Sequence, residues 1–247
     1  MKYFLPVLLT LATPFAASAQ TVTPAITAAL ADSARPADQK ARDAARHSGE
    51  ILAFAGIKPG DKVADFLMGG GYWTRILSPL VGPKGHVYAY QAAEFIQYRP
   101  AYGDEQKAAV VGYANVTALN GPLSAIAFPE PLDAIITVQN YHDLHLSFAP
   151  PGAAAFIAAR LFAALKPGGV LLVVDHVANT DPGFAVPNTL HRIDPAAARK
   201  ELEGVGFVFD GELNVLRNPA DDHTLRVFEP AIQGKTDQFI YRFRKPG

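Results

Sequence analysis

Cysteine is absent from the 247-residue chain, and neither sign of charge predominates. The first absence excludes disulfides, cysteine nucleophiles and thiolate metal ligands, so the packed core alone must stabilise the fold. The second follows from 22 Lys and Arg against 23 Asp and Glu, a formal net charge of −1. Because such a chain has no strong electrostatic field, we do not expect nucleic acid or an anionic membrane as a partner.

The N-terminus has the pattern of a secretory signal peptide. Lys2 supplies the positive charge, residues 4–12 form an apolar stretch, and Ala17-Ser18-Ala19 fits the small-x-small cleavage motif. An uncleaved anchor is the alternative, but the apolar stretch is shorter than the roughly 20 residues that a spanning helix needs. We therefore expect cleavage between Ala19 and Gln20, a periplasmic or secreted location, and no membrane span in the mature chain.

Strand-like and helix-like segments alternate through the rest of the chain, which is 49% hydrophobic. Alternation favours βαβ units and a largely parallel sheet, and the last two strand-like segments follow each other without a helix. We therefore predict a Rossmann-like α/β domain over residues 57–247, preceded by an N-terminal segment and helix over residues 20–56. Its seven-stranded, mostly parallel sheet would carry helices on both faces and an antiparallel strand at the C-terminal edge. The expected strands cover residues 62–67, 86–90, 115–119, 133–138, 170–175, 207–216 and 238–243.

Helix boundaries are set mainly by glycine, proline and capping residues. We expect one helix from Pro36 to a glycine stop at Gly56, and a second from Tyr72 that Pro79 ends. A third covers residues 153–165, and a fourth begins after the Asp194-Pro195 cap.

A glycine run, Gly69, Gly70 and Gly71, follows the first expected strand. Glycines let the backbone approach a ligand closely, and the helix that follows aims free N–H groups at an anion. The same run would also serve tight packing of strand against helix. A nicotinamide cofactor is less favoured, because Thr74 stands at the third glycine position of its motif and Gln91 at its acidic position.

Residues 63–74, with the sequence VADFLMGGGYWT, resemble the first motif of class I S-adenosylmethionine (SAM)-dependent methyltransferases. Further segments resemble that family in the same order: KPGDK at 58–62, GPKGHVYA at 82–89, the strand at 133–138 and LKPGGVL at 165–171. HRID at 191–194 and GKTDQF at 234–239 are similar to a subgroup of exported bacterial predicted methyltransferases. The resemblance covers residues 36–247 and implies SAM as the cofactor.

The resemblance also implies cofactor-binding residues. The glycine run would wrap the methionine part of SAM, and Asp65 would meet its ammonium group. Leu67 stands where the family usually has its first glycine, and Gln91 stands where an acid usually holds the ribose hydroxyls. Gln91, or Glu94 three residues later, would take the ribose, and Asn140 after the fourth strand completes the predicted cofactor pocket.

Polar residues also follow the fourth and fifth strands, at 139–145 and 175–176. In an open α/β sheet these positions share one crevice. A hydroxyl or amine acceptor needs a base, and histidine titrates near neutral pH. We predict His142 as the first candidate and His176 as the second, with Tyr141 and Asp143 beside them; structural pairing of each histidine with a neighbouring Asp is the alternative.

The three-residue spacing of His142 and His145 would suit metal ligation on a helix, but the ligand set is incomplete, so we predict no metal site.

Two functions fit this pattern. The first is a SAM-dependent methyltransferase acting on a small molecule or an envelope component. The second is a non-catalytic ligand-binding protein that keeps the fold. We predict the first function; export keeps the second open as the alternative, because SAM is made in the cytoplasm, and Leu67 and Gln91 also indicate an altered pocket. The sequence predicts no partner protein and no oligomeric state.

Overall fold

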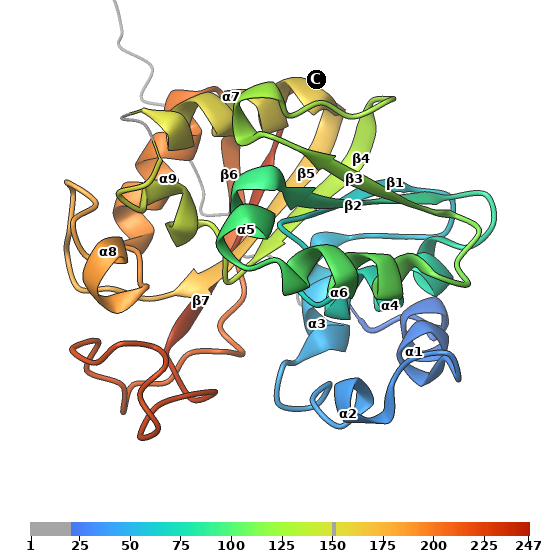
Figure 1. Cartoon of the computed structure of the whole chain (residues 1–247), viewed down its shortest axis with the longest axis horizontal. Coiled ribbons are helices and arrows are strands. Elements are labelled where there is room, and N and C mark those ends of the chain that lie inside the picture. The colour runs from blue at the N-terminus through green and yellow to red at the C-terminus, as the bar shows by residue number, and fades with distance from the viewer. Residues whose placement is uncertain (1–20, 150–151) are drawn as a thin grey trace, which may run out of the picture.

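The computed structural model describes residues 21–149 and 152–247. The expected signal peptide and its cleavage point lie outside the described residues. Seven strands form one sheet in the order β3-β2-β1-β4-β5-β7-β6 (Figure 1). The strands are β1 Lys62–Phe66, β2 His86–Ala92, β3 Val116–Gly121, β4 Leu132–Val138, β5 Leu165–His176, β6 Val208–Glu212 and β7 Gln238–Arg244.

The predicted topology is confirmed. The strand pairs from β3 through β5 are parallel, whereas β7 pairs antiparallel with both β5 and β6. The α-helices are α1 Pro24–Ala31, α2 Ala37–Lys40, α3 Ser48–Ala55, α4 Tyr72–Val81, α5 Ala93–Tyr98, α6 Ala101–Val110, α7 Ala153–Ala164, α8 Pro187–Leu190 and α9 Pro195–Gly204. Short 3₁₀ helices cover Leu123–Ala125 and His142–His145.

Both faces of the sheet are buried. In β5, Leu171 and Val173 belong to the hydrophobic cluster under α7 and α9, while Leu172 and Val174 belong to the cluster under α1, α3 and α4. This alternation follows from the period of two along a strand, and it explains why β5 is apolar from Val170 to Val174. Within the described ranges, no helix is long and apolar enough to cross a membrane.

The prediction of one continuous helix from Pro36 to Gly56 is wrong, because the chain forms two helices, α2 and α3, with irregular turns between them. His47, with φ of 48°, interrupts the helical path. In these turns the Asp43 carboxylate pairs with Arg35 at 2.7 Å and accepts a hydrogen bond from the Tyr72 hydroxyl. These tertiary contacts outweigh the helical preference of the local sequence. Gly56 does end α3, with φ of 73°.

Pro79 does not end α4, which is a second correction. The helix continues to Val81 and stops at Gly82. Leu80 and Val81 are about 1% exposed, so their burial in the core keeps the last turn helical even though Pro79 lacks a backbone N–H. The predicted cap of α9 is confirmed, since the Asp194 carboxylate accepts the Ala196 N–H at 2.8 Å.

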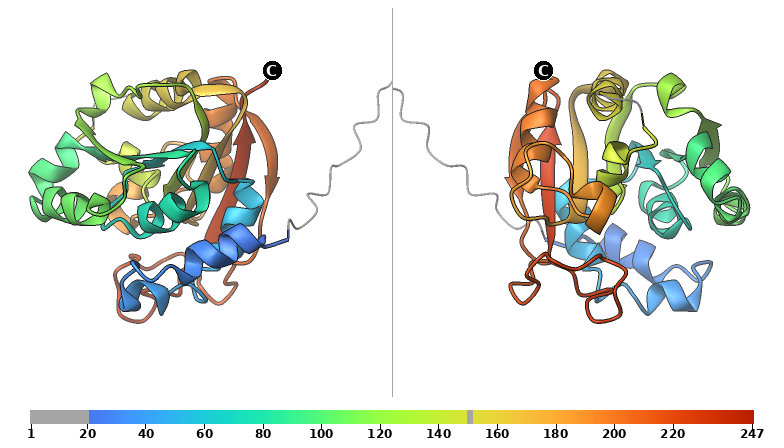
Figure 2. Two further views of the ribbon diagram at one scale, coloured as in Figure 1. Left: turned by 90° about the vertical axis from the view of Figure 1, so that its right-hand side faces the viewer. Right: turned by 60° about the vertical axis from the view of Figure 1, so that its left-hand side comes forward.

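The chain order reverses between β1 and β4, which are neighbours in the sheet. Ligands of open α/β sheets bind at such a point, beyond the carboxyl ends of the strands. The N-terminal helices and the segment between β6 and β7 both lie toward the lower side of every view (Figures 1 and 2), at the end where β5 finishes. These two segments therefore flank the expected crevice.

Candidate functional site

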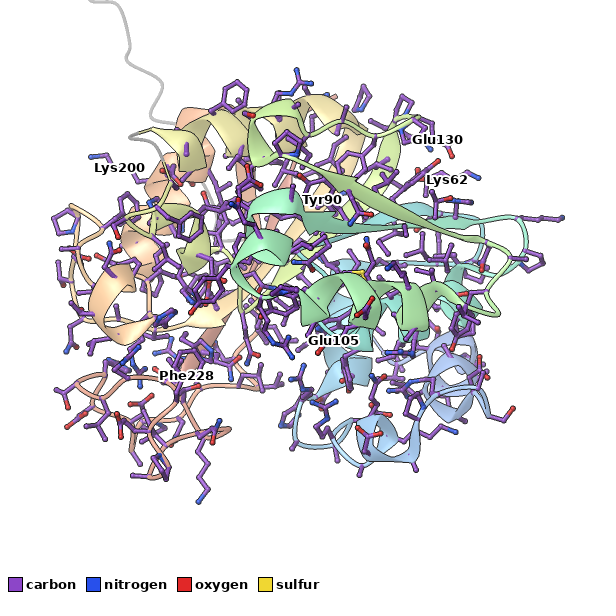
Figure 3. All side chains as sticks on the ribbon, in the orientation of Figure 1. Lys62, Tyr90, Glu105, Glu130, Lys200 and Phe228 are labelled. Atoms are coloured by element: carbon purple, nitrogen blue, oxygen red, sulfur yellow. The ribbon has the colours of Figure 1, made fainter. Side chains whose placement is uncertain are left out.

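The crevice at the carboxyl ends of the strands consists of three adjoining cavities of about 210, 450 and 980 Å³. Gln139, directly after β4, lines all three. Phe228, labelled in Figure 3, comes from the segment between β6 and β7 and lines the two larger ones. The cavities thus adjoin at Gln139 and together extend from the glycine loop to the C-terminal segment.

The glycine loop forms one wall of the smallest cavity, to which Gly69 and Gly70 contribute. Gly71, with φ of 76°, needs to be glycine, because an added Cβ would lie 2.3 Å from the Cβ of Ala109. Leu67 also has a left-handed backbone, with φ of 59°, although it carries a side chain. Leu67 therefore holds a backbone conformation that ordinarily favours glycine.

Asp65 lines the smallest cavity from the end of β1. Its carboxylate accepts a hydrogen bond from the Thr74 hydroxyl at 2.6 Å. Burial raises the pKa of Asp65 to about 6, because the charged form is deprived of water. A cationic ligand group in this cavity would supply the missing countercharge.

Gln91 and Glu94 occupy different places. Gln91 is buried, and its side-chain oxygen accepts the Gly69 N–H at 3.0 Å, which ties the glycine loop to β2. Glu94 lines the 980 Å³ cavity, and both its carboxylate oxygens accept the Leu123 N–H, at 3.0 and 3.1 Å. Of the two residues predicted to hold a ribose, Glu94 is the one on the cavity wall.

Asn140 joins the ends of β1 and β4. Its side-chain amide donates to the carbonyls of Leu67 and Val138, both at 2.8 Å. It lines both the 210 and the 980 Å³ cavities, as expected for a residue directly after the fourth strand.

Two arginines, which the sequence did not indicate as site residues, line the 210 and 450 Å³ cavities. The guanidinium groups of Arg42 and Arg46 lie 5.4 and 4.5 Å from the ring centre of Tyr72. Burial and the neighbouring Arg42 lower the pKa of Arg46. Among the described residues, no carboxylate forms an ion pair with Arg46. This half-buried guanidinium therefore lines the cavity without a direct ion pair, although the Asp43 carboxylate acts on it from a longer distance.

His142 is held between two carboxylates. Its Nδ1 lies 2.7 Å from Asp175 and its Nε2 lies 3.2 Å from Asp143. Burial opposes the charged form, but Asp175 and Asp143 outweigh it and raise the pKa of His142 to about 10. The imidazole is therefore protonated at neutral pH and cannot accept a proton in this state.

His176 has the opposite electrostatic environment. It is buried at the end of β5, lines the 450 and 980 Å³ cavities, and places Nδ1 2.7 Å from the Thr236 hydroxyl. Burial lowers the pKa of His176 to about 4, so the ring is neutral at pH 7. Of the two predicted histidines, His176 is therefore the one that is unprotonated at neutral pH.

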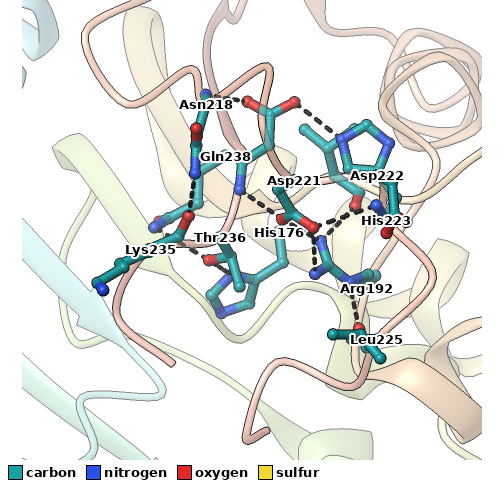
Figure 4. A network of polar contacts seen from close by, with 12 residues as sticks. His176, Arg192, Asn218, Asp221, Asp222, His223, Leu225, Lys235, Thr236 and Gln238 are labelled. Atoms are coloured by element: carbon teal, nitrogen blue, oxygen red, sulfur yellow. Dashed lines mark hydrogen bonds and ion pairs between the residues drawn. The ribbon is translucent and has the colours of Figure 1, made fainter. Parts of the chain in front are cut away.

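A buried polar network supports His176 from behind (Figure 4). Arg192 is fully buried and forms two bonds with the Asp221 carboxylate, at 2.9 and 3.0 Å. Asp221 also accepts the Asp237 N–H at 2.7 Å, next to Thr236 in the chain. The network thus fixes the C-terminal segment that positions Thr236 against His176.

The structure does not bring Tyr141 into the crevice. Its ring is fully buried, and its hydroxyl donates to Glu201. His145 likewise points away, because its ring stacks on Phe184 at 3.8 Å and its Nε2 lies 3.3 Å from Glu201. The His142–His145 spacing therefore does not produce a shared metal site.

Comparison with known proteins extends these observations. No protein-family model matches the chain. The chain is 29% identical to a protein-L-isoaspartate O-methyltransferase of Ignicoccus hospitalis over 159 residues, which is 64% of the chain. It is 26% identical to a protein-L-isoaspartate O-methyltransferase of Methanothermobacter thermautotrophicus over 123 residues, which is 50% of the chain. The matched stretches span 66% and 49% of those proteins' own lengths.

Solved structures show the same architecture. A SAM-dependent methyltransferase from Aquifex aeolicus is 24% identical, with a TM-score of 0.53 over 79% of this chain and 87% of that one. The [4+2]-cyclase SpnF is 15% identical, with a TM-score of 0.57 over 82% of each chain. The chain therefore has the Rossmann-like fold of the SAM-dependent methyltransferases.

Proposed function

We propose that the protein is a SAM-dependent methyltransferase whose crevice binds SAM beside the glycine loop and the methyl acceptor in the 980 Å³ cavity. One observation carries the proposal: the 210 Å³ cavity offers a carboxylate, Asp65, and two arginines, Arg42 and Arg46, across a glycine loop. The methionine part of SAM carries both an ammonium and a carboxylate group. The cavity therefore provides an opposite charge for each end of this zwitterion.

The rest of the cofactor extends along the carboxyl edge of the sheet. Glu94, on the wall of the 980 Å³ cavity, accepts the ribose hydroxyls, while Phe95 beside it offers an aromatic surface to the adenine. Gln91 acts indirectly in this arrangement, since it holds the Gly69 N–H and with it the loop. The hydrogen bonds that the charged Glu94 carboxylate accepts are stronger than those that a neutral amide would accept.

Methyl transfer is an in-line displacement, so the crevice contributes mainly by aligning the reactants. A lone pair of the acceptor atom forms the bond to the methyl carbon as the carbon–sulfur bond breaks. The sulfur leaves with that electron pair as neutral S-adenosylhomocysteine. For a hydroxyl or amine acceptor, the proton passes to the free ring nitrogen of His176, whose other nitrogen bonds Thr236. His142, our first candidate from the sequence, does not take this role because it is already protonated.

The N-terminal signal pattern supports action after export, so we propose a periplasmic or secreted enzyme. A small molecule or an envelope component is then the accessible acceptor. The relatives named as protein-L-isoaspartate O-methyltransferases add a carboxylate to the acceptor classes that need testing.

A methyl-transfer assay tests the proposal. The full chain is incubated with SAM and a panel of phenols, amines and an isoaspartyl peptide, and S-adenosylhomocysteine is measured. With a hydroxyl or amine acceptor, His176→Gln should lower kcat by about 100-fold or more and leave SAM affinity unchanged. The matched control is His86→Gln. His86 is the first residue of β2, whereas the crevice lies at the carboxyl ends of the strands. Full activity in His176→Gln would exclude this residue as the base.

The non-catalytic alternative requires that this fold can occur without methyl transfer, and one comparison bears on that requirement. SpnF, named as a [4+2]-cyclase, shares the fold, so the fold alone does not require methyl transfer. SAM binding without S-adenosylhomocysteine formation across the whole panel would favour this alternative.

A further inference from the structure

Two histidines and one carboxylate meet on the wall of the 980 Å³ cavity. The Oδ1 atom of Asp143 lies 3.2 Å from Nε2 of His142 and 3.8 Å from Nδ1 of His191. One nitrogen from each histidine and one Asp143 oxygen all lie within 4.8 Å of one another. The three side chains come from two separate segments, the 3₁₀ helix after β4 and the residue that follows α8.

His142 is oriented from outside this cluster. Asp175, fully buried, accepts both the backbone N–H of His142, at 2.8 Å, and the proton on its Nδ1, at 2.7 Å. This leaves Nε2 directed at Asp143. A carboxylate that fixes one ring nitrogen while the other is presented outward is the usual support for a metal-ligating histidine.

The second histidine is also held by packing. The ring of His191 contacts that of Phe228 edge-on, with ring centres 4.9 Å apart, and lies 5.5 Å from the ring centre of His142. The side chain of His191 is 22% exposed, so it borders the cavity. A simple ion pair of His142 with Asp143 would not require a second imidazole on the same carboxylate oxygen.

We propose that His142, Asp143 and His191 bind a divalent first-row transition metal, such as Zn²⁺, which would take the place of the proton on Nε2 of His142. Tetrahedral zinc, with bonds of about 2.0 to 2.1 Å, spaces its ligand atoms about 3.3 Å apart. The spacings of 3.2 and 3.8 Å to Asp143 approach this value, and the two histidine nitrogens lie within 4.8 Å of each other, so side-chain rotations would have to bring them closer around the metal. Imidazole ligands favour zinc, iron or copper over magnesium and calcium, which prefer oxygen ligands.

Three protein ligands leave one coordination position open. Catalytic metal sites share this feature, whereas structural zinc sites are closed by four protein ligands. Because the three side chains line the cavity to which the proposed function assigns the methyl acceptor, the metal would be positioned to bind an acceptor oxygen and lower its pKa. This acceptor role rests on the proposed function, whereas metal binding itself does not.

Metal titration of the full chain tests the inference. After treatment with a chelator, the protein is titrated with Zn²⁺ by calorimetry and with Co²⁺ by visible absorption. We expect one equivalent of metal to bind and Co²⁺ to show d–d bands of a low-coordinate site. His191→Ala and Asp143→Ala should each weaken binding by about 100-fold or more. Because His191 is partly exposed, its variant is expected to fold, which circular dichroism confirms.

Two histidine variants serve as controls. His145→Ala removes the neighbour that pairs with Glu201, and His86→Ala removes a histidine at the start of β2. Both should bind metal as the unaltered protein does. Binding that survives His191→Ala, or no stoichiometric binding at all, would overturn the inference. SAM binding, measured on the same samples, separates this result from failure of the proposed function.

Discussion

The side-chain amide of Asn140 donates to the backbone carbonyl of Leu67 at 2.8 Å, and so joins the ends of the two central strands. Leu67 is buried and holds a left-handed backbone with φ of 59°. A residue with a Cβ is strained by roughly 1 to 2 kcal/mol in this region, and glycine is not. The glycine loop thus begins at a strained position that its neighbours hold in place.

Comparison of Leu67→Gly with Leu67→Ala isolates this strain. Both variants lose the buried side chain and both should be destabilised, but the glycine variant should be about 1 kcal/mol more stable than the alanine variant. Leu77, within α4, is the control site, where alanine should be more stable than glycine by about 1 kcal/mol. Urea denaturation measures all four variants. If the alanine variant were more stable than the glycine variant at both sites, Leu67 would not be strained.

Removal of Arg46 should affect only ligands that carry the amino-acid carboxylate. Arg46→Ala is expected to weaken S-adenosylhomocysteine binding by about 10-fold or more, because a partly buried charged hydrogen bond is lost. Binding of 5′-methylthioadenosine, which lacks the amino-acid part, should not change. Arg199→Ala, which removes a surface arginine paired with Glu203, is the matched control for calorimetry. Equal losses for both ligands would remove Arg46 from the carboxylate site.

Asp65 should make the stability of the ligand-free protein depend on pH. Its folded-state pKa, about 6, is above the usual value of 3.8, so the folded state retains the proton between these pH values. The resulting stabilisation is complete below pH 3.8 and is lost as the pH rises through about 6. The shift corresponds to about 3 kcal/mol. Asp65→Asn should therefore be more stable than the unaltered chain at pH 7, by thermal denaturation.

Whereas the stability of the ligand-free protein should fall as the pH rises, its affinity for SAM should increase. The ammonium group of SAM binds the ionised form of Asp65, so SAM affinity is expected to rise between pH 5 and pH 7. In Asp65→Asn the affinity should be lower and almost independent of pH over this interval. A pH profile shared by both proteins would mean that Asp65 does not meet the ammonium group.

The sequence predicts most of the fold because the relevant signals are local. The period-two burial of β5, the Asp194 cap and the glycine stop at Gly56 each depend on a few adjacent residues. The predictions that were wrong concern residues 36–56 and Pro79, where contacts distant in sequence decide the conformation. Asp43 bonds Arg35 and Tyr72, and burial of Leu80 and Val81 extends α4 past the proline.

The site was partly predictable for the same reason. Parallel strands bring their carboxyl ends together, so Asp65, Asn140 and His176 could be assigned to one crevice from the sequence. Arg46 and His191 could not, because each comes from an irregular segment whose path depends on tertiary contacts. The different protonation of His142 and His176 also needed the structure, since two carboxylates raise the pKa of His142 while burial lowers that of His176.

Calorimetric titration of the full chain with SAM is the most direct test of cofactor binding in the crevice. We predict saturable binding of one equivalent, displacement by S-adenosylhomocysteine, and weaker binding in Asp65→Asn and Arg46→Ala but not in Arg199→Ala. Concentrations up to about 1 mM cover the range in which enzymes bind their substrates. No binding of either SAM or S-adenosylhomocysteine by the folded protein over that range would contradict it.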